Sequence, residues 1–293
     1  MVALLMLASG CTTSPAGPVA QRLQVVAAFY PLAYVLDRVG GDMVSVSSLT
    51  KPGVEPHDLE LTAKQVASVA TADLVFYVKG FQAAVDSAVA EQKPKRVLDG
   101  AAVVPLRTTP GFTGEEQDPN ALDPHTWLDP RTMQQYALAV AEQLSQALPA
   151  NAAEFRQRAD DLVKEMSVLD TDFRTGLSQC RLTVFVTSHA AFGYLAERYG
   201  LEQVGITGLS PDAEPTPSRL AAVQRIAQEK GVTTIFSEAL ASPALADALA
   251  KDLNLKTDVL DPLEGITAES RGTDYPSVMY SNLSALRTAG GCQ

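Results

Sequence analysis

The sequence is poor in several residue types, and each shortage narrows what the protein can do. Lysine and arginine number 23 against 34 acidic residues, which gives a formal net charge of −11 and an isoelectric point near 4.8. Because nucleic-acid binding depends on clustered basic residues, this balance argues against a nucleic-acid partner. The 293 residues contain one tryptophan, three histidines and three cysteines. These few residues can therefore be considered one by one.

The first cysteine, Cys11, ends a short apolar run. Residues 1–11 are apolar and finish in Ser-Gly-Cys, which is typical of the end of a secretory signal and too short to cross a bilayer. The ending resembles a bacterial lipoprotein cleavage site, although no Lys or Arg precedes it and Ala8 stands where Leu is more usual. We predict export across the cytoplasmic membrane and lipidation of Cys11, with residues 12–22 as a flexible tether. A signal remnant without lipid is the alternative.

The other two cysteines are predicted to form a disulfide. Export would place Cys180 and Cys292 where disulfides persist. Cys180 immediately precedes a predicted strand, and Cys292 is the penultimate residue. Their pairing would attach the C-terminus to the second half of the chain and stabilise it by about 2–5 kcal/mol. Neither cysteine adjoins a histidine motif, so we expect no metal role for them.

Predicted strands and helices alternate along the chain, and the pattern of the first half recurs in the second half at a constant offset. The matching positions are Tyr34 and Tyr194, Arg38 and Arg198, Gly40 and Gly200, Val44 and Val204, Leu49 and Leu209, Val75 and Ile235, and Phe76 and Phe236. Convergent composition of two α/β halves is the alternative explanation. We predict an α/β fold of two similar lobes, each a parallel-type sheet flanked by helices.

A long amphipathic helix is predicted between the two halves. Apolar residues recur there at intervals of three and four, at Phe155, Ala159, Leu162, Met166, Leu169 and Phe173. About 26 residues at 1.5 Å each would span roughly 39 Å, enough to brace two lobes and restrict their motion. We predict four segments: signal and tether 1–22, N-terminal lobe 23–150, linker helix 151–178 and C-terminal lobe 179–293.

The three histidines lie where ligands are expected rather than in ordinary core. His57 follows the predicted strand 44–49, His189 follows the strand 182–187, and His125 precedes a helix that begins at Pro130. Ligands of parallel α/β sheets bind at the carboxyl ends of strands, and imidazole is the commonest metal ligand among side chains. A lone histidine is more often a surface or core residue. If the three converge, we expect a metal site in the cleft between the lobes.

Two acidic residues at the same edge of the second sheet are candidates for a fourth ligand. Asp261 is favoured because its short side chain follows the predicted strand 256–260 directly before Pro262. Glu238 is the alternative ligand, or the hydrogen-bond partner of a histidine. Three imidazoles and one carboxylate suit tetrahedral zinc. A carboxylate in place of His189 would shift the preference toward manganese.

Four motifs in order resemble the metal-binding substrate-binding lipoproteins of bacterial ABC importers. They are Pro-His-Asp-Leu-Glu-Leu-Thr (56–62), Asp-Pro-His-Thr-Trp-Leu-Asp-Pro (123–130), Thr-Ser-His-Ala-Ala-Phe-Gly-Tyr (187–194) and Asp-Pro-Leu-Glu-Gly (261–265). The resemblance runs from about Val25 to the C-terminus. It implies that a transition metal binds between two lobes joined by a long helix, through the matching residues His57, His125, His189 and Asp261. Zinc members of the family resemble this chain in having three histidines, whereas manganese members carry glutamate in place of His189.

The resemblance implies an extracytoplasmic protein that captures zinc and delivers it to an ABC permease and its ATPase. We expect a monomer that contacts the membrane only through its lipid anchor. A manganese carrier, a metallochaperone or an adhesin with the same site are alternatives. A zinc hydrolase is disfavoured, because the chain has no His-Glu-x-x-His helix and no nucleophile elbow. Residues 111–123 are short and acidic, not histidine-rich, so we expect no accessory zinc site.

Overall fold

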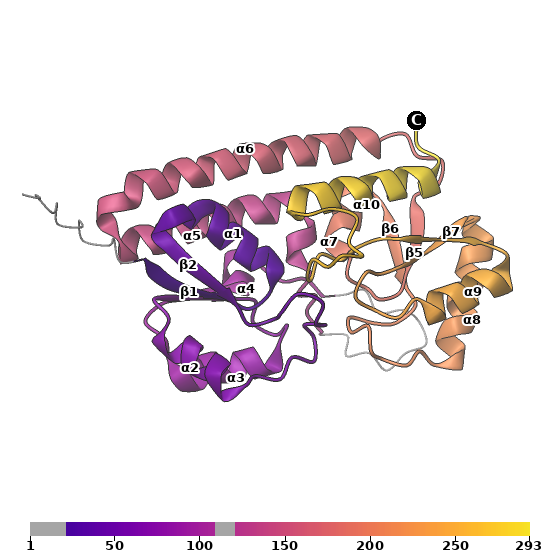
Figure 1. The fold of residues 1–293 in the computed structure, drawn as a ribbon. Coiled ribbons are helices and arrows are strands. Elements are labelled where there is room, and N and C mark those ends of the chain that lie inside the picture. Colours follow the sequence, from indigo (N-terminus) through magenta and orange to yellow (C-terminus); the bar gives the residue numbers. More distant parts are fainter. Residues whose placement is uncertain (1–21, 109–120) are drawn as a thin grey trace, which may run out of the picture.

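The computed structural model describes residues 22–108 and 121–293 (Figure 1). Cys11, almost all of the predicted tether and most of the acidic segment 111–123 lie outside these residues. Within the two described ranges, no helix combines the length and the apolar character needed to cross a bilayer.

The first lobe is built on a four-stranded parallel sheet in the order β2-β1-β3-β4. Its strands are β1 (Leu23–Ala27), β2 (Val44–Ser48), β3 (Leu74–Tyr77) and β4 (Val97–Asp99). Its helices are α1 (Tyr30–Gly40), α2 (Ala63–Thr71), α3 (Ala83–Gln92), α4 (Gly100–Val103) and α5 (Pro130–Ala147). All four residues of β3 are buried, as expected of a central strand covered on both faces.

The second lobe repeats this arrangement with a four-stranded parallel sheet in the order β6-β5-β7-β8. Its strands are β5 (Val184–Thr187), β6 (Glu202–Gly205), β7 (Thr234–Ser237) and β8 (Lys256–Val259). Its helices are α7 (Gly193–Tyr199), α8 (Pro217–Lys230), α9 (Ala244–Leu253) and α10 (Tyr275–Gly290). The prediction of two similar α/β lobes with parallel sheets is confirmed.

The strand registers show how far the duplication holds. Val26 pairs with Val75 in the first sheet, and their counterparts in the second half, Val186 and Ile235, pair in the second sheet. Paired residues of β3 and β4 are separated by the same number of chain positions as the paired residues of β7 and β8. At β2 and β6 the correspondence fails, because Val26 pairs with Ser47 whereas Val186 pairs with Val204. The segment from β5 to β6 is therefore three residues shorter than the segment from β1 to β2. The matches of Val44 with Val204 and of Leu49 with Leu209 were wrong for this reason.

The helix α6 (Ala152–Gly176) lies where the linker helix was predicted and runs along both lobes, beside α5 and α10 (Figure 1). Its six predicted apolar positions are all buried. The hydrophobic core under these helices is continuous from Val25 of the first sheet to Phe236 of the second and Leu286 of α10. A separate, smaller core lies under α8 and α9. The two lobes therefore share most of their apolar interior.

Direct hydrogen bonds also join the lobes close to the predicted histidine motifs. The indole N–H of Trp127 donates to the carbonyl of Pro262 at 2.8 Å. The hydroxyl of Tyr275 donates in turn to the carbonyl of Trp127 at 2.6 Å, and its ring stacks on Tyr34 with centroids 5.6 Å apart. The segments that carry His125 and Asp261 are thus attached to each other.

The disulfide predicted between Cys180 and Cys292 is present in the structure. It joins the segment after α6 to the chain end after α10. The amide of Leu182 donates to the carbonyl of Gly290 beside it at 2.9 Å. The C-terminus is therefore attached to the second lobe, as its sequence position suggested.

Candidate metal site

His57 lies in the loop between β2 and α2, at the carboxyl edge of the first sheet. Gln82, which is buried, donates from its amide nitrogen to Thr50 Oγ1 and to the carbonyl of Pro56, each at 3.0 Å. The backbone amide of His57 donates to Glu55 Oε1 at 3.1 Å. The loop is thus held at Pro56, and the adjacent imidazole has a defined position.

His125 is fully buried and is oriented by Asp123. The carboxylate oxygen Oδ1 of Asp123 accepts a hydrogen bond from the backbone amide of His125 at 3.0 Å and one from its ring Nδ1 at 2.8 Å. With the proton on Nδ1, the other ring nitrogen, Nε2, is free to bind a metal. Of the two other aspartates that flank histidines, Asp129 caps α5 through the amide of Arg131, and Asp58 is exposed.

His189 follows β5 and is oriented in the same way from the second lobe. Glu238, which follows β7, accepts hydrogen bonds from the backbone amide of His189 at 3.0 Å and from its Nδ1 at 2.7 Å. Glu238 is therefore the hydrogen-bond partner of a histidine, which was the second of the two roles that the sequence suggested for it.

The carboxylate that meets the three histidines belongs to Glu264, not to Asp261. Asp261 Oδ1 accepts from the amide of Leu263 at 2.8 Å, and its Oδ2 accepts from the hydroxyl of Ser270 at 3.0 Å. Both carboxylate oxygens of Asp261 thus accept hydrogen bonds from the segment that follows it. Leu263 has a left-handed backbone with φ of 58°, and this turn carries Glu264 to the histidines. The expectation for Asp261 is corrected accordingly; Glu264 stands in the same Asp-Pro-Leu-Glu-Gly motif, three residues later.

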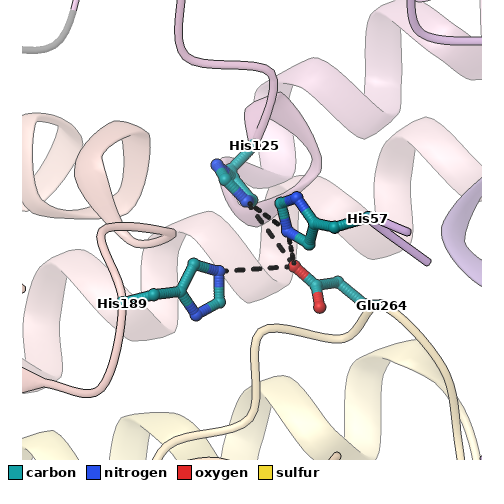
Figure 2. Close-up of side chains that lie close together, drawn as sticks. All are labelled: His57, His125, His189 and Glu264. Atoms are coloured by element: carbon teal, nitrogen blue, oxygen red, sulfur yellow. Dashed lines mark hydrogen bonds and ion pairs between the residues drawn. The ribbon is translucent and has the colours of Figure 1, made fainter. Parts of the chain in front are cut away.

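The four side chains converge on one point between the lobes (Figure 2). Glu264 Oε1 lies 3.3 Å from Nε2 of His57 and 3.5 Å from Nε2 of both His125 and His189. The Nε2 atoms of His57 and His125 are 3.4 Å apart. A zinc ion about 2.0–2.1 Å from four tetrahedral ligands would separate them by about 3.4 Å. The observed spacing fits such an ion.

The site also contains buried polar atoms that a cation would satisfy. Within the described residues, His189 Nε2 and Glu264 Oε2 have no hydrogen-bond partner. Unpaired buried polar groups are costly and rare in folded proteins. The other ring nitrogen of His189 is already bonded to Glu238, so a bound metal ion is the natural partner for Nε2.

The protonation tendencies of these groups follow from burial and from their mutual contacts. Burial lowers the pKa of His57. Burial also disfavours the charged forms of His125 and His189. Asp123 and Glu264 nevertheless raise the pKa of His125. Glu238 and Glu264 raise the pKa of His189 well above its usual range. Burial disfavours the carboxylate of Glu264, yet the close approach of the three imidazoles holds its pKa well below the ordinary value.

Two further carboxyl groups lie close to the cluster. Burial and the charge of Glu264 raise the pKa of Glu55 to about 8, and burial raises that of Asp261 to about 6. Near neutral pH, Glu55 is therefore largely protonated. Glu264 is ionised and faces the three imidazoles, whereas both oxygens of Asp261 accept hydrogen bonds from Leu263 and Ser270.

Three nitrogen donors and one carboxylate make a closed set for a divalent ion. His125, His189 and Glu264 are buried, and the side chain of His57 is 10% exposed. Catalytic zinc keeps one coordination position for water, whereas four protein ligands leave none. The arrangement is suited to holding a metal ion and not to activating a water molecule.

Comparisons with known proteins agree with this geometry. Residues 25–289 match the family model described as ZnuA, zinc-uptake complex component A, periplasmic. The chain is 37% identical to the zinc-binding lipoprotein AdcA of Streptococcus pneumoniae over 277 residues, covering 91% of this chain and 55% of that one. It is 33% identical to the high-affinity zinc uptake system protein ZnuA of Bacillus subtilis, covering 98% and 95%.

A solved structure resembles the whole fold. The crystal structure of Zn(II)-bound AdcA from Streptococcus pneumoniae superposes with a TM-score of 0.78 at 36% identity, covering 92% of this chain and 58% of that one. The chain thus spans about half the length of the pneumococcal relative, and almost the full length of the one from Bacillus subtilis.

Proposed function

The chain belongs to the ZnuA family of zinc-uptake components, and from that premise we propose that it captures one zinc ion between its lobes through His57, His125, His189 and Glu264. The family confirms the resemblance that the four sequence motifs predicted. It also confirms that the chain is a transport component and not an enzyme, because the family model describes part of an uptake complex.

The observation that carries this proposal is the convergence of three imidazole nitrogens and one carboxylate oxygen from both lobes. All four ligand atoms lie within 4.8 Å of one another. Each of His125 and His189 has its second ring nitrogen bonded to a carboxylate, a pattern that fixes the tautomer and strengthens a metal ligand. The site is therefore ordered before the ion arrives.

Zinc is favoured over manganese by the chemistry of the donors. Imidazole suits zinc, whereas carboxylate, carbonyl and water oxygens suit manganese. Glu264 supplies only one of the four ligand atoms, and four ligands at tetrahedral spacing match zinc. His189 is the residue on which this preference depends, because a carboxylate there would give two oxygens and two nitrogens.

Delivery to an ABC permease completes the proposed function. Members of this family work with such a transporter, and we propose that this chain acts as a monomer at the extracytoplasmic face, attached through a lipid on Cys11. A closed four-ligand site does not release its ion readily. Release would therefore require the permease to displace part of one lobe.

Metal analysis of the purified protein tests the proposal. We expect close to one zinc ion per chain and a strong preference for zinc in competitive titrations against manganese. In His189→Glu, the new carboxylate should weaken zinc binding and narrow the preference for zinc over manganese by about tenfold or more. An unchanged preference in this variant would remove the main support for zinc.

A matched control is Glu238→Gln. It alters the hydrogen-bond partner of His189 but leaves the donor set intact. We expect zinc binding to weaken by about 10–100-fold, the range for groups outside the ligand set. The preference for zinc over manganese should not narrow as it does in His189→Glu.

A further inference from the structure

We propose that Tyr194, Arg107 and Asp123 form a clasp between the two lobes that positions His125, so that parting the lobes at this contact lowers the affinity for zinc. The inference rests on the proposed function, because His125 is one of the proposed ligands. Asp123 touches His125 directly. Tyr194 and Arg107 act through Asp123 and are positioning residues.

The hydroxyl group of Tyr194 bonds two segments of the first lobe. Tyr194 belongs to α7 of the second lobe, and its hydroxyl accepts a hydrogen bond from the backbone amide of Arg107 at 3.0 Å. The same hydroxyl donates to the backbone carbonyl of Asp123 at 2.9 Å. Arg107 and Asp123 are themselves joined, since the amide of Asp123 donates to the carbonyl of Arg107 at 2.8 Å. The second lobe thus holds both segments in place.

The guanidinium of Arg107 extends the clasp to the carboxylate that orients His125. It lies over the ring of Tyr194, 4.4 Å from the ring centroid, and its Nη2 is 3.8 Å from Asp123 Oδ2. Oδ2 is buried and accepts no hydrogen bond within the described residues, while Oδ1 receives both bonds from His125. The carboxylate of Asp123 therefore bonds His125 through Oδ1 and faces the guanidinium of Arg107 through Oδ2.

The close approach of α7 at this point depends on glycine. A Cβ atom at Gly193 would collide with Arg107 Nη2 and would lie 2.9 Å from Asp123 Oδ2. Real Cβ atoms do not make contacts that short, so a larger residue would push the guanidinium or the carboxylate away. The sequence is therefore adapted to this contact next to Tyr194.

The contacts of the clasp differ in strength. Arg107 also pairs with Glu197, but the Glu197 side chain is 73% exposed, and ion pairs in water contribute little. Asp123 is 1% exposed and the carbonyl that accepts from Tyr194 belongs to it. The hydroxyl of Tyr194 is therefore the contact that should matter, and the carboxylate of Glu197 should matter little.

A cleft between the lobes lies beside the clasp. Its volume is about 430 Å³, and residues of both lobes line it, among them Arg107, Arg131, Tyr194 and Arg198. A displacement of α7 away from residues 107 and 123 would break both hydrogen bonds of Tyr194. Asp123 would then lose the hydrogen bond from Tyr194 to its carbonyl, and His125, which Asp123 orients, would be held less firmly.

Tyr194→Phe tests the clasp because it removes only the hydroxyl group. We expect zinc affinity, measured by competition with a chromophoric chelator, to fall about tenfold, the lower end of the effect of groups that support ligands. Glu197→Gln should change it by less than about twofold. The matched control is Tyr34→Phe at the counterpart position of the first lobe, whose hydroxyl accepts from the side chain of Arg38. The variant keeps the ring that stacks on Tyr275, so it should bind zinc like wild type.

A second readout needs no metal. The chain has only three histidines, so their ring nitrogens can be followed individually by NMR in the metal-free protein. Tyr194→Phe should shift the resonances of His125 and leave those of His189 nearly unchanged. Wild-type zinc affinity together with unshifted His125 resonances would overturn the clasp. Failure of the wild type to bind zinc would contradict the proposed function, while the NMR comparison would still test the positioning of His125.

Discussion

Glu264 and Asp261 stand three residues apart in one turn and have different roles. Glu264 meets the three imidazoles, whereas both oxygens of Asp261 accept hydrogen bonds from Leu263 and Ser270. The amide of Asp261 also donates to Asn282 Oδ1, and Asn282 donates back to its carbonyl. Asp261 thus holds the turn that presents the proposed ligand.

A pair of isosteric variants separates these roles. Glu264→Gln replaces a charged ligand by a neutral amide, and we expect zinc affinity to fall by more than about 100-fold, beyond the usual effect of a supporting group. Asp261→Asn keeps an oxygen that can accept from Leu263, so its loss should stay within about tenfold. Competitive titration with a chelator measures both values. The reverse order would return the ligand role to Asp261.

The sequence pointed to the turn at residues 261–265, but it favoured Asp261 over Glu264, the residue that meets the three histidines. The strand-end rule placed a carboxylate ligand after β8, and the turn there does supply the carboxylate that meets the three histidines. The preference for the shorter side chain failed because a left-handed leucine at position 263 is unusual and cannot be read from the sequence. The three histidines needed no such detail, since each follows a strand or a Pro-bounded segment that faces the cleft.

In the proposed function, protons and zinc compete for the same imidazoles, which predicts a pH dependence of stability. In the metal-free protein, the raised pKa values of His125 and His189 contribute stability that is fully present below the ordinary histidine value of about 6.5 and is lost as pH rises through the folded-state values. Zinc binds the deprotonated rings. The rise in Tm caused by saturating zinc should therefore increase from pH 5.5 to pH 8.

Calorimetry of metal-free and zinc-saturated protein across this pH range measures the effect directly. The Glu264→Gln variant is the control, because weak binding should leave it with a small zinc-dependent rise in Tm at every pH. A rise in the wild type that is the same at pH 5.5 and pH 8 would show that ring protonation does not oppose binding.

At the scale of elements, the duplication was predictable and its limits were not. Three strands of each sheet keep a constant offset between the lobes because their registers are the same in both. The fourth pair, β2 and β6, departs by three residues. Short runs of apolar residues indicate that a strand exists, but they do not indicate the length of the connection before it.

The helix α6 was predictable for a different reason. Six of its apolar residues, from Phe155 to Phe173, recur at intervals of three and four, and these six are buried. Long, strongly periodic segments are the most reliable to read. Its packing partner α10 could not be read in the same way, since its position depends on the disulfide and on the hydrogen bond between Tyr275 and Trp127.

At the scale of the whole molecule, the shared core limits how far the lobes can move. The apolar interior continues from one sheet to the other, and the hydrogen bond from Trp127 to Pro262 crosses between the lobes. A hinge that closes widely needs lobes with separate cores joined by flexible strands or loops. Zinc capture by this chain should therefore be a local event near the site, not a large closure.

Distance measurements between the lobes test this expectation. Spin labels on Lys64→Cys in α2 and Lys251→Cys in α9, both exposed, with Cys11→Ser to avoid a third label, report the lobe separation by pulsed electron resonance. Saturating zinc should move the mean distance by less than about 1–2 Å, as in other binding proteins whose sites are formed in advance. In a Trp127→Phe background, the lost bond to Pro262 should broaden the distance distribution of the metal-free protein, and zinc should narrow it again. A shift of many ångströms in the parent protein would mean that the shared core is broken in the metal-free state, and that the lobes close on zinc as hinged domains.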